Sequence, residues 1–282
     1  MRISVIGCGY LGATHAACMA ELGHDVVGLE VDADKLAVLE KGHVPFHEPG
    51  LDDLLEKHVE SGRLRFTDDP IEAAGFGEVH FICVGTPQQQ DSLGADLTYV
   101  YAAVESLAPY LRPGALVVGK STVPVGTAAQ LARLLDELSP PGAQVELAWN
   151  PEFLREGYAV KDTLQPDRLV FGLTSEAAEA KLRSVYARAI GDGTPVVVTD
   201  YPTAELVKVS ANAFLATKIS FINAVAEICE ITGADVKELA DAIGYDDRIG
   251  RKFLNAGVGF GGGCLPKDIR AFLHRAGELG AD

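Results

Sequence analysis

The sequence opens with Met1-Arg2-Ile3-Ser4-Val5-Ile6-Gly7-Cys8-Gly9-Tyr10-Leu11-Gly12, a short apolar run followed by the pattern GxGxxG. The run from Arg2 to Ile6 is nearly all apolar, which is typical of a parallel strand buried on both faces. A helical pattern follows over residues 11–22, and a second apolar run over residues 25–29 ends in Glu30. This order of strand, tight turn, helix and strand predicts the first unit of a Rossmann-like sheet.

The glycines of this turn have separate physical uses. The first two let the backbone turn and approach a pyrophosphate closely, and the third lets the helix pack on the strand. The helix N-terminus attracts the phosphate charge, and an acid at the end of the second strand accepts hydrogen bonds from the ribose and disfavours a 2′-phosphate. We therefore predict NAD as the cofactor rather than NADP. The predicted cofactor-binding residues here are Gly7, Gly9, Tyr10, Leu11, Gly12 and Glu30, with Lys35 either at the adenosine end or on the solvated helix surface.

Strands and helices continue to alternate up to about residue 200, which predicts an α/β fold with a doubly wound parallel sheet. Up to eight strands are expected, enough for a six-stranded Rossmann unit with a small extension. Ligands of such sheets lie beyond the carboxyl ends of the strands. Thr86 and Thr122 follow the strands expected at 79–84 and 115–119, so both are candidates for the cofactor cleft. For each threonine, a role in capping a turn is the alternative.

Two carboxylates follow the strand expected at 145–148. They belong to the segment Asn150-Pro151-Glu152-Phe153-Leu154-Arg155-Glu156-Gly157. If this segment is helical, Glu152 and Glu156 share one face, because residues four apart are neighbours on a helix. A carboxylate at this edge of the sheet can activate or hold a water molecule. A solvated charged turn is the alternative.

The pattern changes from about Pro202 onward. Residues 204–232 contain no Pro or Gly and predict one long helix, with a shorter helix over 236–243. We expect a Rossmann-like NAD-binding domain over residues 1–200, followed by an all-helical central domain over 201–282 that forms a homodimer through the long helix. Lys208 and Asn212 lie four apart on that helix, among apolar residues. Such a lysine is either a surface residue with a buried stem or a functional residue with a perturbed pKa.

The composition excludes several classes of partner. With 40 acidic and 24 basic residues the net charge is −16, so we expect neither a nucleic-acid nor an anionic-membrane surface, since both need a basic face. The five cysteines are scattered and form no CxxC pair, so no disulfide framework and no metal site is predicted. No secretory leader and no membrane span are expected. These features together predict a cytoplasmic protein.

A glycine-rich run lies near the end of the sequence: Gly257-Val258-Gly259-Phe260-Gly261-Gly262-Gly263-Cys264-Leu265-Pro266-Lys267-Asp268. Such backbone can adopt positive φ angles and press closely against a ligand. Cys264 stands at its end, with an ammonium and a carboxylate three and four residues further on. Two interpretations stay open for this cysteine: a nucleophile presented by a bare loop, or a buried structural thiol.

These motifs, in this order, resemble the UDP-glucose 6-dehydrogenases among the nucleotide-sugar four-electron dehydrogenases. The matching segments are Gly7 to Gly12, Gly85-Thr86-Pro87, Lys120 to Pro124, Asn150 to Gly157, Pro166-Asp167-Arg168, Glu205 with Lys208 and Asn212, Asp247 to Gly250, and Phe260 to Asp268. The resemblance implies oxidation of the C6 alcohol of a nucleotide sugar to the uronate with two NAD+, most closely UDP-glucose to UDP-glucuronate.

The resemblance also implies roles for residues. Cys264 would be the nucleophile that forms a thiohemiacetal and then a thioester. Lys208 would stabilise oxyanions with Asn212 beside it, and Asp268 would assist proton transfer. The implied residues for ordering and activating water are Thr122, Glu156 and Glu152. Further cofactor contacts are implied for Thr86, Thr122, Glu156 and Lys267. Substrate contacts are implied for Glu152, Phe153, Leu154, Arg155, Lys208, Asn212, Arg248, Phe253, Asn255, Gly257 and Gly261.

Two departures from the family pattern stand out. Gly263 occupies a position where relatives often carry a serine or an aromatic residue. Family members also continue for well over a hundred residues into a second Rossmann-like domain that closes over the nucleotide, so we expect this chain to be a fragment or to have its partner domain on another chain. Two further functions are open: a two-electron hydroxyacid dehydrogenase, and a non-catalytic NAD-binding and dimerisation module.

Overall fold

The computed structural model describes residues 1–281, which divide into two compact units. The first unit comprises Met1–Pro87 and Asp96–Leu206, and the second comprises Gln88–Ala95 and the described residues from 207 to 281.

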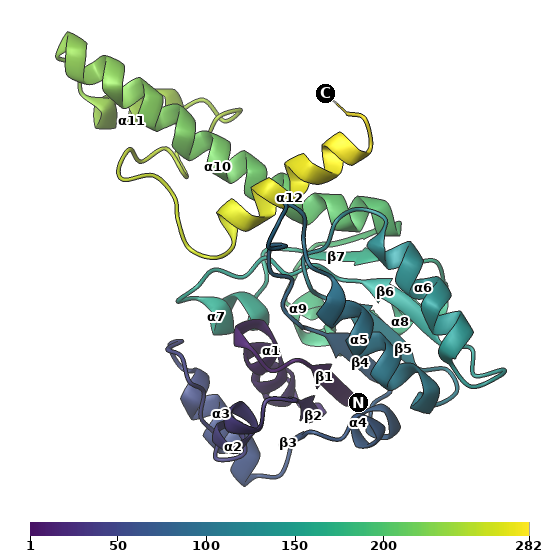
Figure 1. Cartoon of the computed structure of the whole chain (residues 1–282). Coiled ribbons are helices and arrows are strands. Elements are labelled where there is room, and N and C mark those ends of the chain that lie inside the picture. Colours follow the sequence, from purple (N-terminus) through teal and green to yellow (C-terminus); the bar gives the residue numbers. More distant parts are fainter. Residues whose placement is uncertain (282) are drawn as a thin grey trace. The chain divides into compact units, whose positions relative to one another are not determined.

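The first unit contains an eight-stranded sheet in the order β3-β2-β1-β4-β5-β6-β7-β8 (Figure 1). Every neighbouring pair is parallel except β6 and β7. The first six strands have the order of a dinucleotide-binding Rossmann sheet, and β7 with β8 extends it. The predicted fold class, including the extended six-stranded unit, is therefore confirmed. The strands are β1 (Arg2–Ile6), β2 (Asp25–Leu29), β3 (Leu64–Thr67), β4 (Val79–Ile82), β5 (Leu116–Gly119), β6 (Glu146–Trp149), β7 (Leu169–Gly172) and β8 (Val196–Thr199).

Helices connect these strands. Because parallel crossovers are right-handed, reversing the strand order after β3 places the later helices on the opposite face of the sheet. The helix contacts agree: α1 packs on α3 and α7, whereas α5 packs on α4 and α6. The helices are α1 (Tyr10–Glu21), α2 (Ala33–Leu39), α3 (Leu51–Glu60), α4 (Pro70–Phe76), α5 (Thr98–Leu107), η1 (Ala108–Tyr110), α6 (Thr127–Leu138), α7 (Ala159–Leu164), α8 (Glu176–Val185) and α9 (Ala187–Gly191).

The core of this unit is built on the central strands. Residues of β1 and β4 such as Ile3, Val5, Val79 and Phe81 are fully buried, as the apolar runs predicted for strands covered on both faces. The strand register places Ile6 opposite Ile82. The segments that follow β1 and β4 therefore leave the sheet at the same edge, which positions the candidate site.

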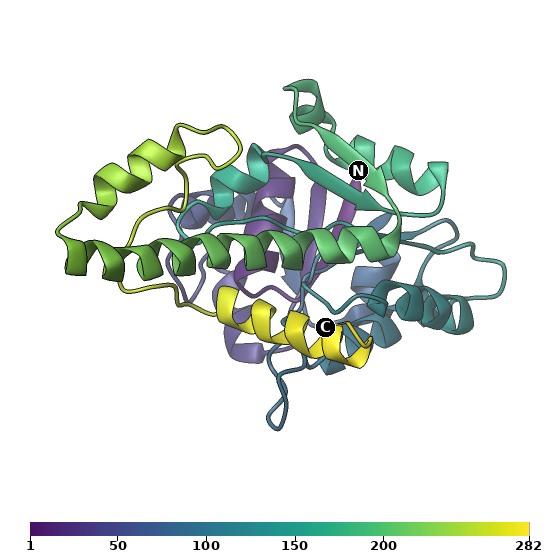
Figure 2. The same ribbon diagram turned by 90° about the horizontal axis from the view of Figure 1, so that it is seen from above.

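The second unit is helical. Its main element is α10 (Tyr201–Thr232), a single 32-residue helix that begins in the first unit, and Figure 2 shows it as continuous. The chain reverses at Gly233, where φ is +76°, and enters α11 (Val236–Gly244). Buried Ile222, Ala240 and Leu254 form the small core between these helices and the following loop. The last helix is α12 (Leu265–Glu278).

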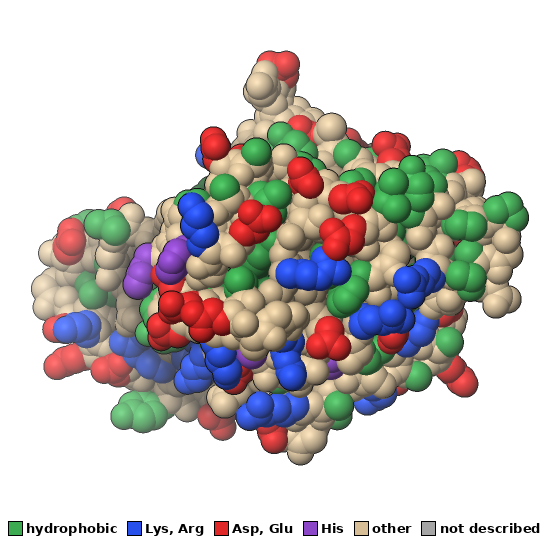
Figure 3. Space-filling model, turned by 90° about the horizontal axis from the view of Figure 1, so that it is seen from below, with side chains coloured by type: hydrophobic (Ala, Val, Ile, Leu, Met, Phe, Trp, Pro, Cys, Tyr) green, Lys and Arg blue, Asp and Glu red, His purple; other side chains and the backbone are tan. Residues whose placement is uncertain are grey.

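On the face drawn in Figure 3, acidic and basic side chains are intermixed. Among residues 1–281, no helix has the length and the apolar character that crossing a membrane requires.

Candidate active site

The glycine-rich turn after β1 has the geometry that a phosphate-binding turn needs. Gly7 has φ +85°, and a Cβ on Gly12 would lie 1.8 Å from the carbonyl oxygen of Gly7, so only glycine fits at these two positions. Gly9 is exposed, and a Cβ there would meet no atom within 4 Å. The turn thus combines close helix–strand packing with open space at the N-terminus of α1. These features fit the pyrophosphate of a dinucleotide.

Glu30 lies beside this turn at the end of β2. Glu30 is 7% exposed, and its carboxylate accepts hydrogen bonds from the backbone N–H of Cys8 (3.2 Å) and of Asp32 (3.0 Å). Because each carboxylate oxygen has two lone pairs, one remains on each oxygen for a ribose hydroxyl. Lys35 is exposed and pairs with Asp32 at 3.5 Å. The Glu30 carboxylate is therefore held in place beside the glycine-rich turn.

Thr86 joins the two loops that follow β4 and β5. It is 7% exposed, and its hydroxyl donates a hydrogen bond to the carbonyl oxygen of Thr122 (2.8 Å). The neighbouring Ser121 hydroxyl donates to the carbonyl oxygen of Val84 (2.7 Å). The structure thus brings the two predicted threonines into contact, with Thr86 in a turn-stabilising role.

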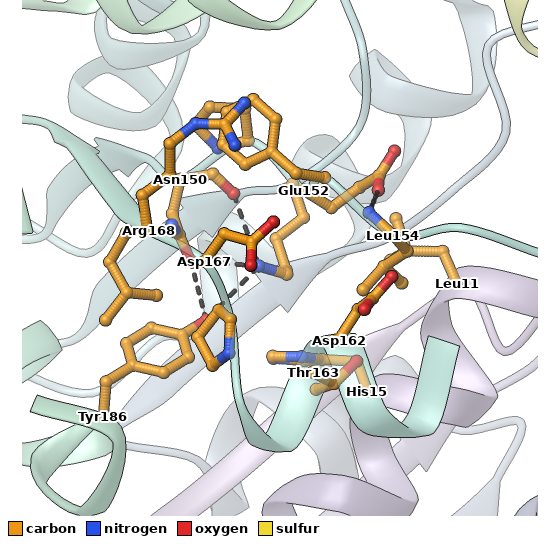
Figure 4. Close-up of a pocket in the computed structure, with 15 residues that line it drawn as sticks. Leu11, His15, Asn150, Glu152, Leu154, Asp162, Thr163, Asp167, Arg168 and Tyr186 are labelled. Atoms are coloured by element: carbon orange, nitrogen blue, oxygen red, sulfur yellow. Dashed lines mark hydrogen bonds between the residues drawn. The ribbon is translucent and has the colours of Figure 1, made fainter. Parts of the chain in front are cut away.

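The segment after β6 is a turn and not a helix, so Glu152 and Glu156 do not share a helical face. Residues 151–155 form no regular secondary structure, and a turn follows at residues 156–157, where Gly157 has φ +82°. Glu152 accepts a hydrogen bond from the backbone N–H of Leu154 (2.6 Å), as Figure 4 shows. Glu156 is exposed. This corrects the helical alternative for the segment.

The side chains of this turn are fixed by neighbours in the same unit. Arg155 forms a two-point ion pair with Asp162 (2.6 and 2.8 Å), and the guanidinium of Arg168 lies 3.7 Å from the centre of the Phe153 ring. Below the turn lies a cavity of about 40 Å³, which has room for a few water molecules. Its lining includes Leu11, His15, Lys120, Asn150, Glu152, Phe153 and Leu154.

In the second unit, Cys264 is exposed at the N-cap of α12, so it is not a buried structural thiol. Positive φ angles at Gly259 and Gly262 give the preceding run its path. Four residues after Cys264, Asp268 is 2% exposed, and its carboxylate accepts hydrogen bonds from Asn212 Nδ2 and Lys267 Nζ, both at 2.7 Å. The sequence-predicted Asn212, Lys267 and Asp268 therefore lie together. A helix N-terminus attracts negative charge, so α12 presents its positive end to the thiol.

Lys208 is 5% exposed and lies one helical turn before Asn212 on α10. The alternative of a surface lysine with a solvated head is therefore wrong. A buried ammonium at this position is the feature expected of a group that stabilises a developing negative oxygen.

The structure brings together only some of the residues that were predicted to bind the substrate in this unit. Phe253, with φ +67°, and Asn255 line a cavity of about 420 Å³, together with Lys252. Gly257 donates its backbone N–H to Asn223 Oδ1 (2.8 Å), and Gly261 is exposed. Arg248 is paired with Asp246 (2.6 Å), and its side chain is 88% exposed.

Comparison with known proteins decides the family. Residues 1–190 match the UDP-glucose/GDP-mannose dehydrogenase family, NAD binding domain, and residues 202–282 match its central domain. The chain belongs to the UDP-glucose/GDP-mannose dehydrogenase family. It is 47% identical over 278 residues to the UDP-glucose 6-dehydrogenase of Rhizobium meliloti and 46% identical over 279 residues to UDP-glucose 6-dehydrogenase TuaD of Bacillus subtilis. These alignments cover 98% and 99% of this chain, but 63% and 60% of the relatives.

Solved structures agree with this assignment. A UDP-glucose dehydrogenase from Pyrobaculum islandicum has a TM-score of 0.93 and 42% identity, covering 99% of this chain and 65% of that one. A GDP-mannose dehydrogenase from Pseudomonas aeruginosa has a TM-score of 0.83 and 34% identity, covering 100% and 66%. The chain thus spans less than two thirds of these relatives, and the part it spans is the NAD-binding and central domains of the UDP-glucose/GDP-mannose dehydrogenase family. NAD is its cofactor.

A buried polar cluster around Lys120, beside the glycine-rich turn, was not predicted from the sequence. Lys120 is 7% exposed and donates hydrogen bonds to Asn150 Oδ1 (3.0 Å) and the Tyr186 hydroxyl (3.3 Å). Its ammonium lies between the rings of Phe81 and Tyr186, at 5.8 and 5.7 Å. Burial, with Lys120 as a second cause, holds the pKa of nearby His15 well below its usual value. The polar Lys120 at a predicted strand end was the available signal.

Glu205 is the second residue whose contacts could not be foreseen. It is 2% exposed and accepts hydrogen bonds from the backbone N–H of Gly126 and of Ala128, both at 2.7 Å. These are N–H groups at the start of α6 that no helical carbonyl can reach. Glu205 therefore caps α6 and anchors the start of α10 to the loop that follows Thr122.

Proposed function

We propose that the protein oxidises the C6 alcohol of a nucleotide sugar to the carboxylate, with UDP-glucose as substrate and UDP-glucuronate as product. The observation that carries this proposal is Cys264, an exposed thiol on a glycine-rich loop, followed one turn later by the buried Asp268. A two-electron dehydrogenase has no need of such a thiol. When bound, NAD+ accepts one hydride in each of the two oxidation steps.

Cys264 is the nucleophile in this proposal. Its Sγ bonds to the carbonyl carbon of the aldehyde produced by the first oxidation, and the thiol proton passes to the aldehyde oxygen to give a thiohemiacetal. Loss of a hydride and a proton from this species leaves a thioester on Sγ. Lys208 offers a buried ammonium for the negative oxygen that develops in these steps. Asp268, bonded to Asn212 and Lys267, assists the proton transfers.

Water then cleaves the thioester, releasing the uronate and restoring the thiol. We assign the ordering of this water to Thr122 and Glu156, and its activation to Glu152. The bond from the Leu154 N–H to Glu152 supports this assignment, because a fixed carboxylate at the edge of the sheet is oriented for work on a water molecule. We also assign contacts with the substrate to Glu152, Phe153, Leu154 and Arg155.

The nucleotide sugar is assigned to the loop that follows α11. The cavity of about 420 Å³ lined by Phe253 and Asn255 supports this, and Lys252 supplies it with a cation suited to a diphosphate. The remaining assignments to the substrate are Lys208, Asn212, Arg248, Gly257 and Gly261, and those to the cofactor are Gly7, Gly9, Tyr10, Leu11, Gly12, Glu30, Lys35, Thr86, Thr122, Glu156 and Lys267.

We further propose that two copies pair through α10. Phe214, Phe221 and Ile228 stand seven residues apart on this helix and are 65%, 52% and 59% exposed. Side chains at this spacing form one apolar stripe, which a second copy of the same helix can cover. Sedimentation of Phe221→Glu should give a monomer, with Tyr99→Glu on α5 as the control. A wild-type monomer would contradict the dimer. The five cysteines are scattered and form no disulfide within residues 1–281, which supports a cytoplasmic location.

Stoichiometry tests the function. We would supply NAD+ with UDP-glucose, GDP-mannose and UDP-N-acetylmannosamine in turn, and identify products by mass. The proposal predicts UDP-glucuronate and two NADH for each acid formed. One NADH per product would instead indicate a two-electron dehydrogenase. NAD+ binding without turnover of any nucleotide sugar would indicate a non-catalytic module, the function that the chain's partial coverage of its relatives leaves as the alternative.

A further inference from the structure

Glu48 is a buried carboxylate that no motif singled out. It lies in the connection between α2 and α3, within His47-Glu48-Pro49-Gly50, and is 3% exposed. A buried carboxylate is unfavourable unless hydrogen-bond donors surround it. Glu48 has three such donors, and they come from two parts of the first unit that are remote in sequence.

The first donor belongs to the phosphate-binding turn. Tyr10 is the first residue of α1, and its hydroxyl donates a hydrogen bond to Glu48 Oε2. The Tyr10 ring also contacts Phe46, with ring centres 5.2 Å apart. Burial and, secondly, the bond to Glu48 raise the pKa of Tyr10 above its usual value, so the phenol keeps its proton and remains a donor. Tyr10 can therefore contact a cofactor through its backbone while its hydroxyl holds Glu48.

The other two donors belong to the turn that carries Glu152 and Glu156. The backbone N–H of Gly157 donates to Glu48 Oε2 and that of Ala159 donates to Oε1, both at 2.8 Å. Ala159 begins α7, so its N–H has no partner within that helix. The Gly157 N–H is also 3.3 Å from the Tyr10 hydroxyl oxygen. Both carboxylate oxygens are thus used to hold this turn.

We propose that Glu48 is a positioning residue that fixes the turn at 150–158 to the phosphate-binding turn. It links the first residue of α1 to the end of the segment that bears the proposed hydrolytic carboxylates. Loss of this link frees Gly157 and Ala159, and with them the orientation of Glu152 and Glu156, without removing any group assigned to cofactor or substrate. The part of this inference that concerns hydrolysis rests on the proposed function, whereas the part that concerns the turn and NAD does not.

The test on the 282-residue chain compares Glu48→Gln with Tyr10→Phe and with Glu60→Gln, an exposed glutamate of α3 that undergoes the same charge change. Glutamine keeps the size of Glu48 but presents an NH2 group to one of its three donors. Amide hydrogen exchange across residues 155–160 should become about tenfold faster, the factor that corresponds to about 1.4 kcal/mol. The dissociation constant for NAD+ should rise about two- to tenfold. Glu60→Gln should change neither.

Tyr10→Phe removes a single hydroxyl and keeps the ring, so we expect the variant to fold. It should reproduce part of the loss in NAD+ affinity, and its effect should not add to that of Glu48→Gln, since both changes break one link. Unchanged exchange over 155–160 in Glu48→Gln would overturn the proposal. Faster exchange across the whole first unit would also overturn it, because Glu48 would then act on stability alone. Faster exchange confined to 155–160 with unchanged NAD+ affinity would overturn it as well.

Turnover supplies the readout for the hydrolytic carboxylates. In Glu48→Gln, intact mass during turnover with UDP-glucose should reveal an acyl group retained on the protein, because thioester cleavage slows more than the oxidations do. Hydrolysis as fast as in the wild type would overturn this part. If the wild type itself makes no uronate, the proposed function fails, and the exchange and NAD+ measurements still decide the role of Glu48.

Discussion

Replacing Glu30 by alanine perturbs the NAD site at one defined point. In the structure its carboxylate is nearly buried and is already oriented by the N–H groups of Cys8 and Asp32, so a bound ribose forms its hydrogen bonds without further ordering of the side chain. The substitution removes the acceptor for the ribose hydroxyls. The loss should be roughly 1–2 kcal/mol, the scale of one or two hydrogen bonds, which corresponds to an affinity lower by about five- to thirtyfold.

Isothermal titration of the 282-residue chain with NAD+ measures this loss directly. Glu40→Ala serves as the control, because Glu40 is an exposed acid at the end of α2 and its removal changes the net charge equally. The ratio of NADP+ to NAD+ affinity should also rise in Glu30→Ala, since the carboxylate that repels a 2′-phosphate is gone. Unchanged NAD+ affinity would refute the assignment of Glu30 to the ribose.

Three further predictions concern buried polar groups. Asp268→Asn should lower the free energy of unfolding by about 1.5–3 kcal/mol in urea titrations, because Asn212 loses a charged acceptor; an unchanged value would show that this carboxylate contributes no stability. Lys120→Met should cost about 1–3 kcal/mol in the same assay, since its hydrogen bonds to Asn150 and Tyr186 are lost, and a more stable variant would contradict this. Burial lowers the pKa of His80 to about 3, so below about pH 6.5 the unfolded chain binds a proton that the folded chain excludes. The free energy of unfolding should therefore be fully present above about pH 6.5 and fall below it by up to about 1.4 kcal/mol per pH unit. His80→Gln should reduce this slope.

The Rossmann unit could be predicted because its signals are local. The apolar run before Gly7, the glycines of the turn and the acid at the end of the next strand each follow from backbone geometry within about thirty residues. The long helix was equally readable, since residues 204–232 contain no residue that stops a helix. The structure starts it at Tyr201, only three residues earlier.

Some features carry a local signal in the sequence that did not enter the predictions above. The helix over Thr127–Leu138 carries an ordinary amphipathic pattern after Gly126. Gly157, which has φ +82°, could have been recognised as a turn residue at the end of the segment with Glu152 and Glu156. In both cases the residues that decide the local backbone were printed in the sequence.

Other features had no local signal. The Glu48 carboxylate accepts hydrogen bonds from donors 109 and 111 residues away, and Glu205 caps a helix that starts 78 residues before it. A glutamate before Pro-Gly reads as part of a turn, and a glutamate on a helix reads as a solvated face. Only the tertiary fold decides which distant N–H groups a buried carboxylate accepts from.

The central claim is that acid formation passes through a covalent bond to Cys264, and product analysis of Cys264→Ala tests it most directly. NAD+ and UDP-glucose would be supplied to this variant and to the wild type, with titration confirming that both bind NAD+ equally. The account predicts that the variant forms no UDP-glucuronate while its NAD+ affinity is unchanged. Uronate formation by Cys264→Ala at the wild-type rate would contradict it.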